Sequence, residues 1–203
     1  MTPTPSSALA VDGAGFAGDP RADFAHSTDL ELVRLARVER GAFTELYRRH
    51  YPAVGAYLWR RTADAHATED LLAETFLAAL QGLDRLRERD VPPRFWLLRI
   101  ATNLLHKRWR DGAVRATVAE IEPPEHSDGS DATSALVLEE DQLRAQRAMR
   151  ALDSDQQSVL ALYYVEGLAL GEIALVLDCK VGTIKSRLSR AREALAVELA
   201  RRH

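Results

Sequence analysis

The chain has 203 residues, with 30 acidic and 27 basic side chains and a formal net charge of −3, and this length suits one large or two small domains. Its single cysteine, Cys179, excludes an internal disulfide and a zinc site built from several cysteines, and its six histidines show no ligand spacing. We therefore expect no metal and no other cofactor. The sequence has no run of about 18 apolar residues and no basic N-terminal segment followed by an apolar one, so we expect a soluble, cytoplasmic protein that is not secreted.

Helices are favoured over strands, because Ala, Leu, Arg and Glu dominate while aromatic and β-branched residues are sparse. Residues 1–26 are rich in Ala, Gly, Pro, Ser and Thr without periodicity, which predicts a disordered N-terminal tail. The first helix should begin after a cap at Ser27 or Thr28. Its apolar face is expected to hold Leu30, Val33 and Ala36.

Three longer helices are predicted next. The first follows Gly41, and Pro52 is a candidate site for a kink in it. The second covers about residues 65–80, and the third covers residues 94–110 after a loop that ends in two prolines. The first of these helices should present on one face Phe43, Leu46, Tyr47, His50, Val54 and Leu58, and the second should bury Leu72, Phe76 and Leu80.

A polar segment separates these helices from the C-terminal part of the chain. Residues 112–134 contain Pro, Gly, Ser and several acids, which predicts a flexible acidic linker. A helix over residues 135–152 then opens a C-terminal domain. Because the linker is too polar to fold alone, the two domains that it joins are expected to move independently in the free protein, each around its own small core.

The net charge conceals two basic blocks, residues 94–110 and 181–203, which are separated by the acidic stretch 111–141. Binding to phosphates depends on the cations that a surface presents, so these blocks matter more than the total charge. The negative total still opposes tight non-specific binding by the free protein. We therefore expect a protein that recognises DNA only with help.

Residues 153–195 have the pattern of a helix-turn-helix. A short apolar segment, Leu170–Leu177, is followed by a tight turn and a helix from Val181. One face of that helix is apolar, with Ile184, Leu188, Ala191 and Leu195. The opposite face carries Ser186, Ser189, Arg190 and Glu193, with Lys185 and Arg187 on its flanks. Such a face suits the DNA major groove, although a basic amphipathic surface helix is the alternative when this helix is taken alone.

Five segments, taken in order, resemble bacterial sigma factors of the extracytoplasmic-function group, which retain only sigma regions 2 and 4. The segments are FTELYRRHYPAVGAYLWRR, ATEDLLAETFLAAL, WLLRIATNLL, DQQSVLALYYVEGLALGEIA and VGTIKSRLSRAREAL. The resemblance implies an all-α fold of two small helical domains, a region 2 bundle and a region 4 helix-turn-helix, joined by the flexible acidic linker. The implied division is a tail at 1–26, region 2 at 27–111, the linker at 112–134 and region 4 at 135–203.

The resemblance also implies the roles of particular residues. Contacts to the −35 element fall to Lys180, Thr183, Lys185, Ser186, Arg187, Ser189 and Arg190. Contacts to the −10 element fall to Arg99, Asn103, Lys107, Arg108 and Arg110, and contacts to polymerase fall to Glu69, Asp70 and Glu74. The chain departs from the usual family residues at Ala73, Pro93, Lys107, Asp178, Lys180 and Val181. Cys179 is expected to pack in the turn rather than act as a redox sensor.

The predicted function is that of an RNA polymerase sigma factor, which binds core polymerase, recognises the −35 element as duplex and melts the −10 element. Its expected partners are core RNA polymerase, promoter DNA and an anti-sigma factor, with no small-molecule substrate and no membrane insertion. The alternative is a stand-alone helix-turn-helix regulator, which should bind its operator alone and as a dimer. The sequence shows no paired carboxylates, His/Cys constellation or Gly-rich phosphate loop, so we do not expect an enzyme.

Overall fold

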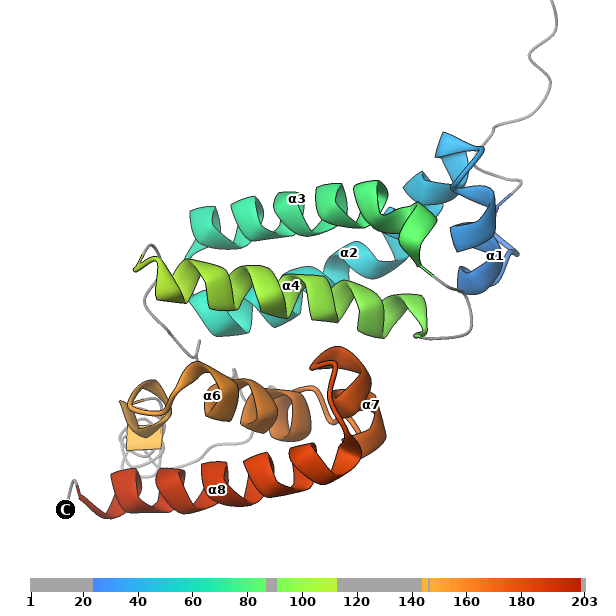
Figure 1. Cartoon of the computed structure of the whole chain (residues 1–203). Coiled ribbons are helices and arrows are strands. Elements are labelled where there is room, and N and C mark those ends of the chain that lie inside the picture. The colour runs from blue at the N-terminus through green and yellow to red at the C-terminus, as the bar shows by residue number, and fades with distance from the viewer. Residues whose placement is uncertain (1–23, 87–90, 113–143, 146, 202–203) are drawn as a thin grey trace, which may run out of the picture.

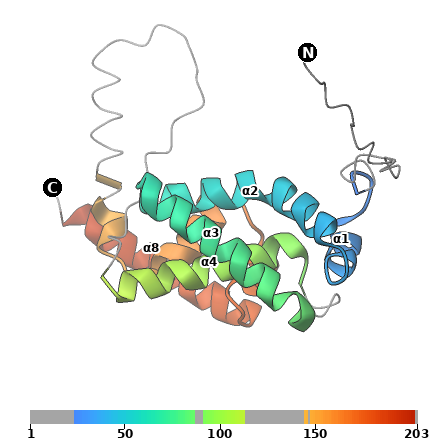
Figure 2. The same cartoon turned by 90° about the horizontal axis from the view of Figure 1, so that it is seen from above.

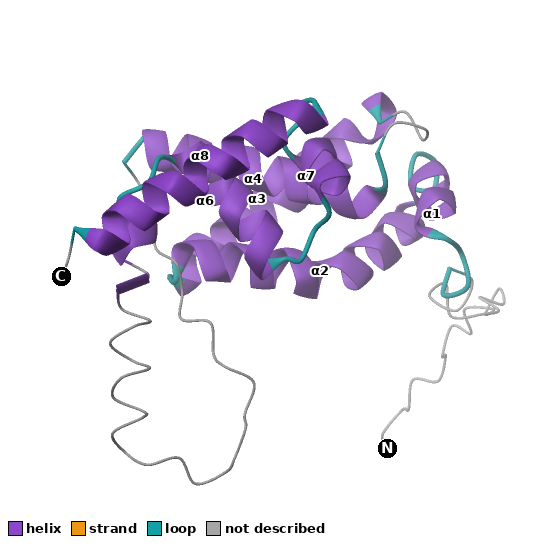
Figure 3. Cartoon of the chain, turned by 90° about the horizontal axis from the view of Figure 1, so that it is seen from below, coloured by secondary structure: helices purple, strands orange, loops and turns teal. Residues whose placement is uncertain are grey.

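The computed structural model describes residues 24–86, 91–112, 144–145 and 147–201. Within these residues all regular elements are helical, as predicted, and none is a strand (Figure 3). The N-terminal bundle consists of α1 (Asp29–Leu35), α2 (Arg40–Thr62), α3 (Ala65–Gly82), a 3₁₀ turn (Leu83–Arg85) and α4 (Pro93–Arg110). The C-terminal domain consists of α6 (Ser154–Leu160), a π-helical turn (Ala161–Val165), α7 (Leu170–Val176) and α8 (Val181–Ala200).

Side chains that cap the helices fix where several of them begin. Thr28, rather than Ser27, caps α1: its Oγ1 accepts the backbone N–H of Glu31 at 3.3 Å, and the Glu31 carboxylate accepts the Thr28 N–H at 2.7 Å. Asp153 and Gln156 form the same reciprocal pair at the start of α6. These bonds satisfy N–H groups that a helix leaves without partners at its start.

The buried stripe of each helix differs in part from the prediction. Leu72 and Phe76 are buried in α3, but Leu80 is 46% exposed, because nine residues at 100° each place it half a turn around the helix from the fully buried Leu71. Leu71 and Ala79 complete the buried face instead. Predictions that placed two further side chains on apolar faces were also wrong, since the side chains of Leu30 and Tyr47 are exposed.

Helix α4 joins the two parts of the molecule (Figure 1). One of its sides packs against α2 and α3, and another packs against α6 and α7. A single cluster of buried apolar residues therefore runs from the N-terminal bundle into the C-terminal domain, where we had expected two separate cores. In this conformation the two domains contact one another, because α4 offers apolar side chains to both; their independent movement in the free protein stays a prediction.

A second apolar cluster lies at the far end of the bundle, around α1 (Figure 2). It includes Phe24, a residue that we had assigned to the N-terminal tail and that is only 8% exposed. The guanidinium of Arg49 donates hydrogen bonds to the carbonyls of Phe24 and Ala25 at 3.1 and 2.9 Å. The rest of the tail, the linker at 112–134 beyond Gly112, and most of the predicted helix at 135–152 lie outside the described residues.

The position of the α3 stripe can be tested with two leucines of the same helix. Leu71→Ala removes a fully buried side chain and should lower the free energy of unfolding by about 2–5 kcal/mol. Leu80→Ala, at the exposed position, should change it by no more than about 0.5 kcal/mol. Urea denaturation followed by circular dichroism measures both, and equal losses would contradict this packing.

Candidate nucleic-acid interface

The helix-turn-helix is formed by α7, a tight turn and α8. Ile184, Leu188 and Ala191 are buried and hold α8 against the C-terminal domain, as predicted. The turn is closed by the Cys179 N–H, which donates to the carbonyl of Ala174 at 3.1 Å. Asp178 has a left-handed backbone, with φ at +50°. Glycine adopts this conformation most easily and Asp tolerates it better than most residues, so Asp178 is compatible with the turn.

The opposite face of α8 is open to solvent. Four side chains that we predicted to contact the −35 element are exposed there, namely Lys185, Ser186, Ser189 and Arg190, and Lys180 is exposed at the start of the helix. Their present hydrogen bonds are local: Ser186 Oγ donates to the carbonyl of Thr183 at 3.0 Å, and Arg190 Nε donates to that of Ser186 at 3.3 Å. The structure therefore brings these residues together on one accessible surface.

Two other predicted −35 residues are less accessible. Arg187 forms an ion pair with Asp155 of α6, at 3.2 Å, and its side chain is 32% exposed. Thr183 is half-buried. Arg187 thus points toward α6 rather than outward with Arg190.

The residues of α4 that we predicted to contact the −10 element have different surroundings in the structure. Arg99 faces the C-terminal domain: its Nε donates to the carbonyl of Leu175 at 3.0 Å, and its Nη1 lies 3.2 Å from the Asp178 carboxylate. Arg108 lies nine residues later, which is half a turn around the helix, and faces α3. Asn103, Lys107 and Arg110 are exposed.

The acidic surface of α3 has a partner within the protein. Glu69, Asp70 and Glu74 are exposed, and Arg108 Nη2 donates to Glu74 at 2.9 Å and to Asp70 at 3.3 Å. The like charges at Asp70 and Glu74 are thus compensated within the protein by Arg108. A contact of this surface with polymerase stays a prediction.

A polar seam lies where the N-terminal bundle meets the C-terminal domain. Arg60, near the end of α2, forms an ion pair with Glu166. Arg61 is only 2% exposed; its Nη1 and Nη2 donate to the carbonyl of Gln157 and to Ser158 Oγ, both at 3.3 Å. We did not predict these two arginines as functional, because they lie outside both basic blocks. The sequence feature that could have identified them is that two arginines stand side by side near the end of a helix.

His106 completes this seam from α4. Its Nε2 lies 2.7 Å from Ser158 Oγ, and its Nδ1 lies 4.0 Å from Asp155. Burial lowers the pKa of His106 below its usual value, and nearby Arg61 and Arg110 lower it further while Asp155 opposes the shift. The neutral imidazole is therefore the form that fits the seam.

Neither the single cysteine nor a metal site adds to this interface. Cys179 is half-buried and burial raises the pKa of its thiol, which favours packing over thiolate chemistry. In the described ranges no group of three or more His, Cys, Asp or Glu side chains could hold a metal ion. None of the helices in the part of the chain that the structure describes is long and apolar enough to cross a membrane.

Known proteins match both parts of the chain. The family model for sigma-70 region 2 matches residues 46–115, and a model for sigma-70 region 4 matches residues 142–195. RNA polymerase sigma-H factor of Pseudomonas aeruginosa is 31% identical over 177 residues, covering 82% of this chain and 91% of that protein. ECF RNA polymerase sigma factor SigW of Bacillus subtilis is 31% identical over 180 residues, covering 82% and 95%.

Solved structures share the fold. The structure of CnrH in complex with the cytosolic domain of CnrY matches with a TM-score of 0.58 and 25% identity, covering 86% of this chain and 99% of that chain. The sigma factor RpoE in complex with the anti-sigma factor NepR from Bartonella quintana matches with a TM-score of 0.54 and 24% identity, covering 79% and 98%. The second match is evidence for the fold alone.

The seam should make stability depend on pH through His106. Its pKa is lowered in the folded state, so the unfolded chain takes up the proton at a higher pH than the folded chain does. The stability contributed by neutral His106 is complete above the usual histidine pKa, about 6.5, and is lost as pH falls through the lowered folded value. His106→Gln should therefore reduce the fall in Tm between pH 7.5 and pH 5.5.

Thermal unfolding of both proteins at the two pH values measures this difference. His50 is also buried with a lowered pKa, but it is present in both proteins and its contribution cancels. An unchanged pH dependence in His106→Gln would show that this imidazole is not the titrating group.

Proposed function

Because the chain belongs to the extracytoplasmic-function family of RNA polymerase sigma factors, we propose specific surfaces for its contacts with polymerase and promoter. The protein is a transcription initiation factor that directs RNA polymerase to promoters. The C-terminal domain binds the −35 element as duplex, and the N-terminal bundle binds core polymerase and the −10 element. The exposed polar face of α8, held from behind by Ile184, Leu188 and Ala191, is the observation that supports this division most directly.

In this proposal the residues of α8 have different roles at the −35 element. Arg190 uses its Nε within the helix, so its two terminal nitrogens can reach O6 and N7 of a guanine. Lys185 lies toward the flank and reaches phosphate. Lys180 does the same near the start of α8, where backbone N–H groups already favour anions.

At the −10 element, Asn103, Lys107 and Arg110 are the accessible contacts in the present conformation. Arg99 and Arg108 belong to the same proposed set, but each must first exchange a protein partner for DNA. The half-buried Trp96 packs against both apolar clusters, which favours a structural role. Trp109 lies beneath the Arg61 guanidinium, with its ring centroid 4.8 Å away, so it packs at the seam here.

The proposed partners follow from the same family membership. Glu69, Asp70 and Glu74 form an exposed acidic surface suited to a basic surface of core polymerase. The structure of CnrH, which this chain resembles, contains the cytosolic domain of CnrY, and we propose that this chain is likewise controlled by a protein partner, an anti-sigma factor. The protein would act in the cytoplasm with polymerase, by binding rather than by covalent chemistry. The proposed domain division is 27–111, 112–134 and 135–203, with Phe24 as an N-terminal extension of the bundle.

The −35 proposal can be tested with two cations of α8. In reconstituted holoenzyme, Arg190→Ala should cost about 1–3 kcal/mol of promoter binding and relax base preference at one position. Lys185→Ala should weaken binding to all sequences and lower the salt slope by about one unit. Promoter binding over a salt series, with −35 variants, measures both.

Arg201→Ala is a matched control, because Arg201 is exposed at the end of the same helix and pairs with Glu198. Equal, sequence-independent losses for Arg190→Ala and Lys185→Ala would make Arg190 a phosphate contact only. Wild-type binding by both variants would remove α8 from the groove.

The polymerase contact needs a test that separates it from the internal pair with Arg108. Asp70→Lys/Glu74→Lys should weaken binding to core polymerase strongly, because it reverses the charge offered to the partner. Arg108→Gln breaks the same internal pairs while keeping both carboxylates, so it should leave core binding near wild type. Both should lower thermal stability only slightly, since exposed ion pairs contribute about 0–1 kcal/mol.

Affinity for core polymerase measured by fluorescence anisotropy distinguishes the two variants. If Arg108→Gln weakens core binding as much as the double reversal does, the acids act by holding Arg108 rather than by contacting polymerase. If neither variant binds more weakly than wild type, the acidic surface of α3 lies outside that contact.

A further inference from the structure

One cation of the predicted −35 set, Arg187, is held by another helix of the same domain. Its Nη2 lies 3.2 Å from Oδ2 of Asp155, which belongs to the first turn of α6. Because three residues turn a helix by about 300°, Arg187 lies about 60° around α8 from the buried Ile184 and about 60° from the exposed Arg190. Arg187 therefore stands at the boundary between the packed and the open face of α8, on the side of α6.

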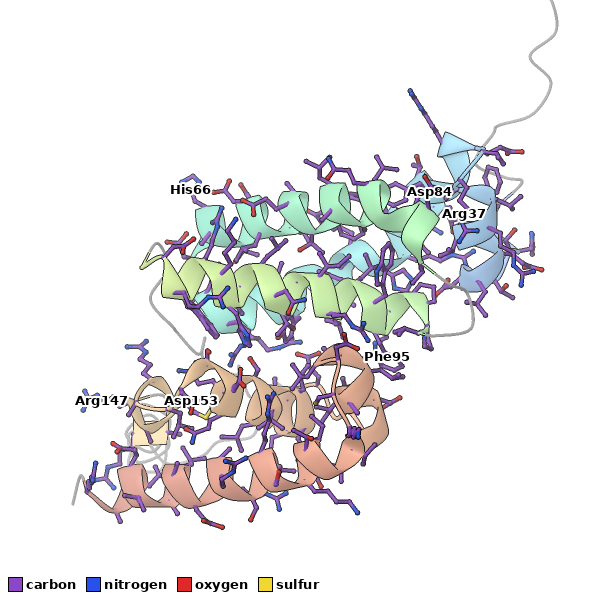
Figure 4. The ribbon with its side chains drawn as sticks, in the orientation of Figure 1. Arg37, His66, Asp84, Phe95, Arg147 and Asp153 are labelled. Carbon is purple, nitrogen blue, oxygen red and sulfur yellow. The ribbon has the colours of Figure 1, made fainter. Side chains whose placement is uncertain are left out.

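A hollow of about 240 Å³ lies between the start of α6 and this edge of α8. Its lining consists of Asp153, Asp155, Gln156, Arg187 and Arg190. The side chains of Asp153 and Gln156 cap α6 through reciprocal hydrogen bonds, whereas the Asp155 carboxylate reaches across to α8. Asp153, labelled in Figure 4, marks the end of α6 at which the hollow lies.

The pair of Asp155 and Arg187 does not depend on the contact between the domains, because both residues belong to the C-terminal domain. His106 approaches Asp155 from the N-terminal bundle, but only to 4.0 Å between Nδ1 and Oδ1. Burial lowers the pKa of His106, so this imidazole brings no positive charge near neutral pH. Within the described residues, Arg187 is therefore the cation that compensates Asp155.

Folding stability does not account for an acid at this place. The side chain of Asp155 is 51% exposed and that of Arg187 is 32% exposed, and exposed ion pairs contribute little to folding. A carboxylate beside a DNA-binding face also opposes the approach of phosphates. The effect of Asp155 is therefore expected on DNA binding, where it limits what the Arg187 guanidinium can reach.

We propose that Asp155 is a positioning residue for Arg187 and, through it, a specificity-determining residue at the −35 element. This inference rests on the proposed function of α8 and deepens it. Held in one place, Arg187 directs its remaining N–H groups to a backbone phosphate only in the register of α8 at which Arg190 meets its base.

A freed Arg187 would behave differently, because its long side chain could adapt to phosphates in every register of α8 on the duplex. Phosphate contacts carry no sequence information directly, so this adaptation would strengthen binding to any duplex. Specificity is a difference between two affinities. A restraint that weakens binding to the wrong sequences therefore raises specificity without adding a base contact.

The test compares reconstituted holoenzymes on two duplexes, a promoter that the wild-type holoenzyme binds and the same promoter with its −35 element scrambled. Asp155→Ala removes the carboxylate and leaves Arg187 in place. Discrimination, the ratio of the two affinities measured by anisotropy, should fall at least about threefold at low salt, and the salt slope for the scrambled duplex should steepen by about 0.9 for one added phosphate contact. Wild-type discrimination by Asp155→Ala would overturn the inference.

The loss must also depend on Arg187. In holoenzyme that already carries Arg187→Gln, adding Asp155→Ala should leave discrimination unchanged, because no guanidinium remains to be released. A loss of the same size in that background would overturn the inference, since Asp155 would then act by its own charge on the duplex.

Glu198→Ala is the matched control. It makes the same change in net charge and releases an arginine of the same helix, Arg201, whose Nη1 lies 3.0 Å from the Glu198 carboxylate. This pair lies near the end of α8, away from the hollow, so discrimination should stay at the wild-type value. A similar loss in Glu198→Ala would overturn the role of Asp155, because net charge would then explain the effect.

These outcomes are separable from failure of the proposed −35 contact. That failure would appear as wild-type binding by Arg190→Ala on all −35 variants. If Arg190→Ala relaxes base preference while Asp155→Ala keeps wild-type discrimination, α8 binds the −35 element and only the role of Asp155 is overturned.

Discussion

The structure depends on the way α4 is enclosed. Its fully buried side chains, including Leu97, Ala101 and Leu105, lie in an apolar cluster shared by the N-terminal bundle and the C-terminal domain. A buried hydrogen bond between Tyr57 and Thr102 at 2.8 Å fixes α4 on α2. One helix therefore belongs to two packing interfaces, and any large movement of the C-terminal domain exposes one side of it.

The polar side chains around that apolar contact have two possible kinds of partner. Arg99 and Arg108 form hydrogen bonds within the protein, yet the same nitrogen atoms are those that would meet phosphate or base oxygens. A hydrogen bond to DNA then replaces a hydrogen bond to protein, so its net contribution is smaller than that of a free cation. Together with the net charge of −3, this exchange would weaken DNA binding in the absence of polymerase, as we expected from the sequence.

The two surfaces that we propose for DNA binding differ in this respect. The outward face of α8, with Lys185 and Arg190, is accessible in the closed conformation. The side of α4 that carries Arg99 is covered by α7 and the turn that follows it, through Leu175 and Asp178. In this proposal, binding of duplex by α8 would require no rearrangement of that helix, whereas use of Arg99 would require the domains to separate.

Sequence alone determined the elements and the anchoring of α8. The 3.6-residue repeat of Ile184, Leu188 and Ala191 identifies its buried face, and the capping residues at Ser27 and Thr28 place the start of the first helix to within one residue, because these signals act within a few residues. Only the tertiary structure decided which way Arg99 and Arg108 point, that Leu80 is exposed, and that Arg60 and Arg61 lie at a seam. Those properties depend on contacts between segments far apart in the chain, such as Arg61 with Gln157, and no local periodicity encodes the surface against which a helix face will pack.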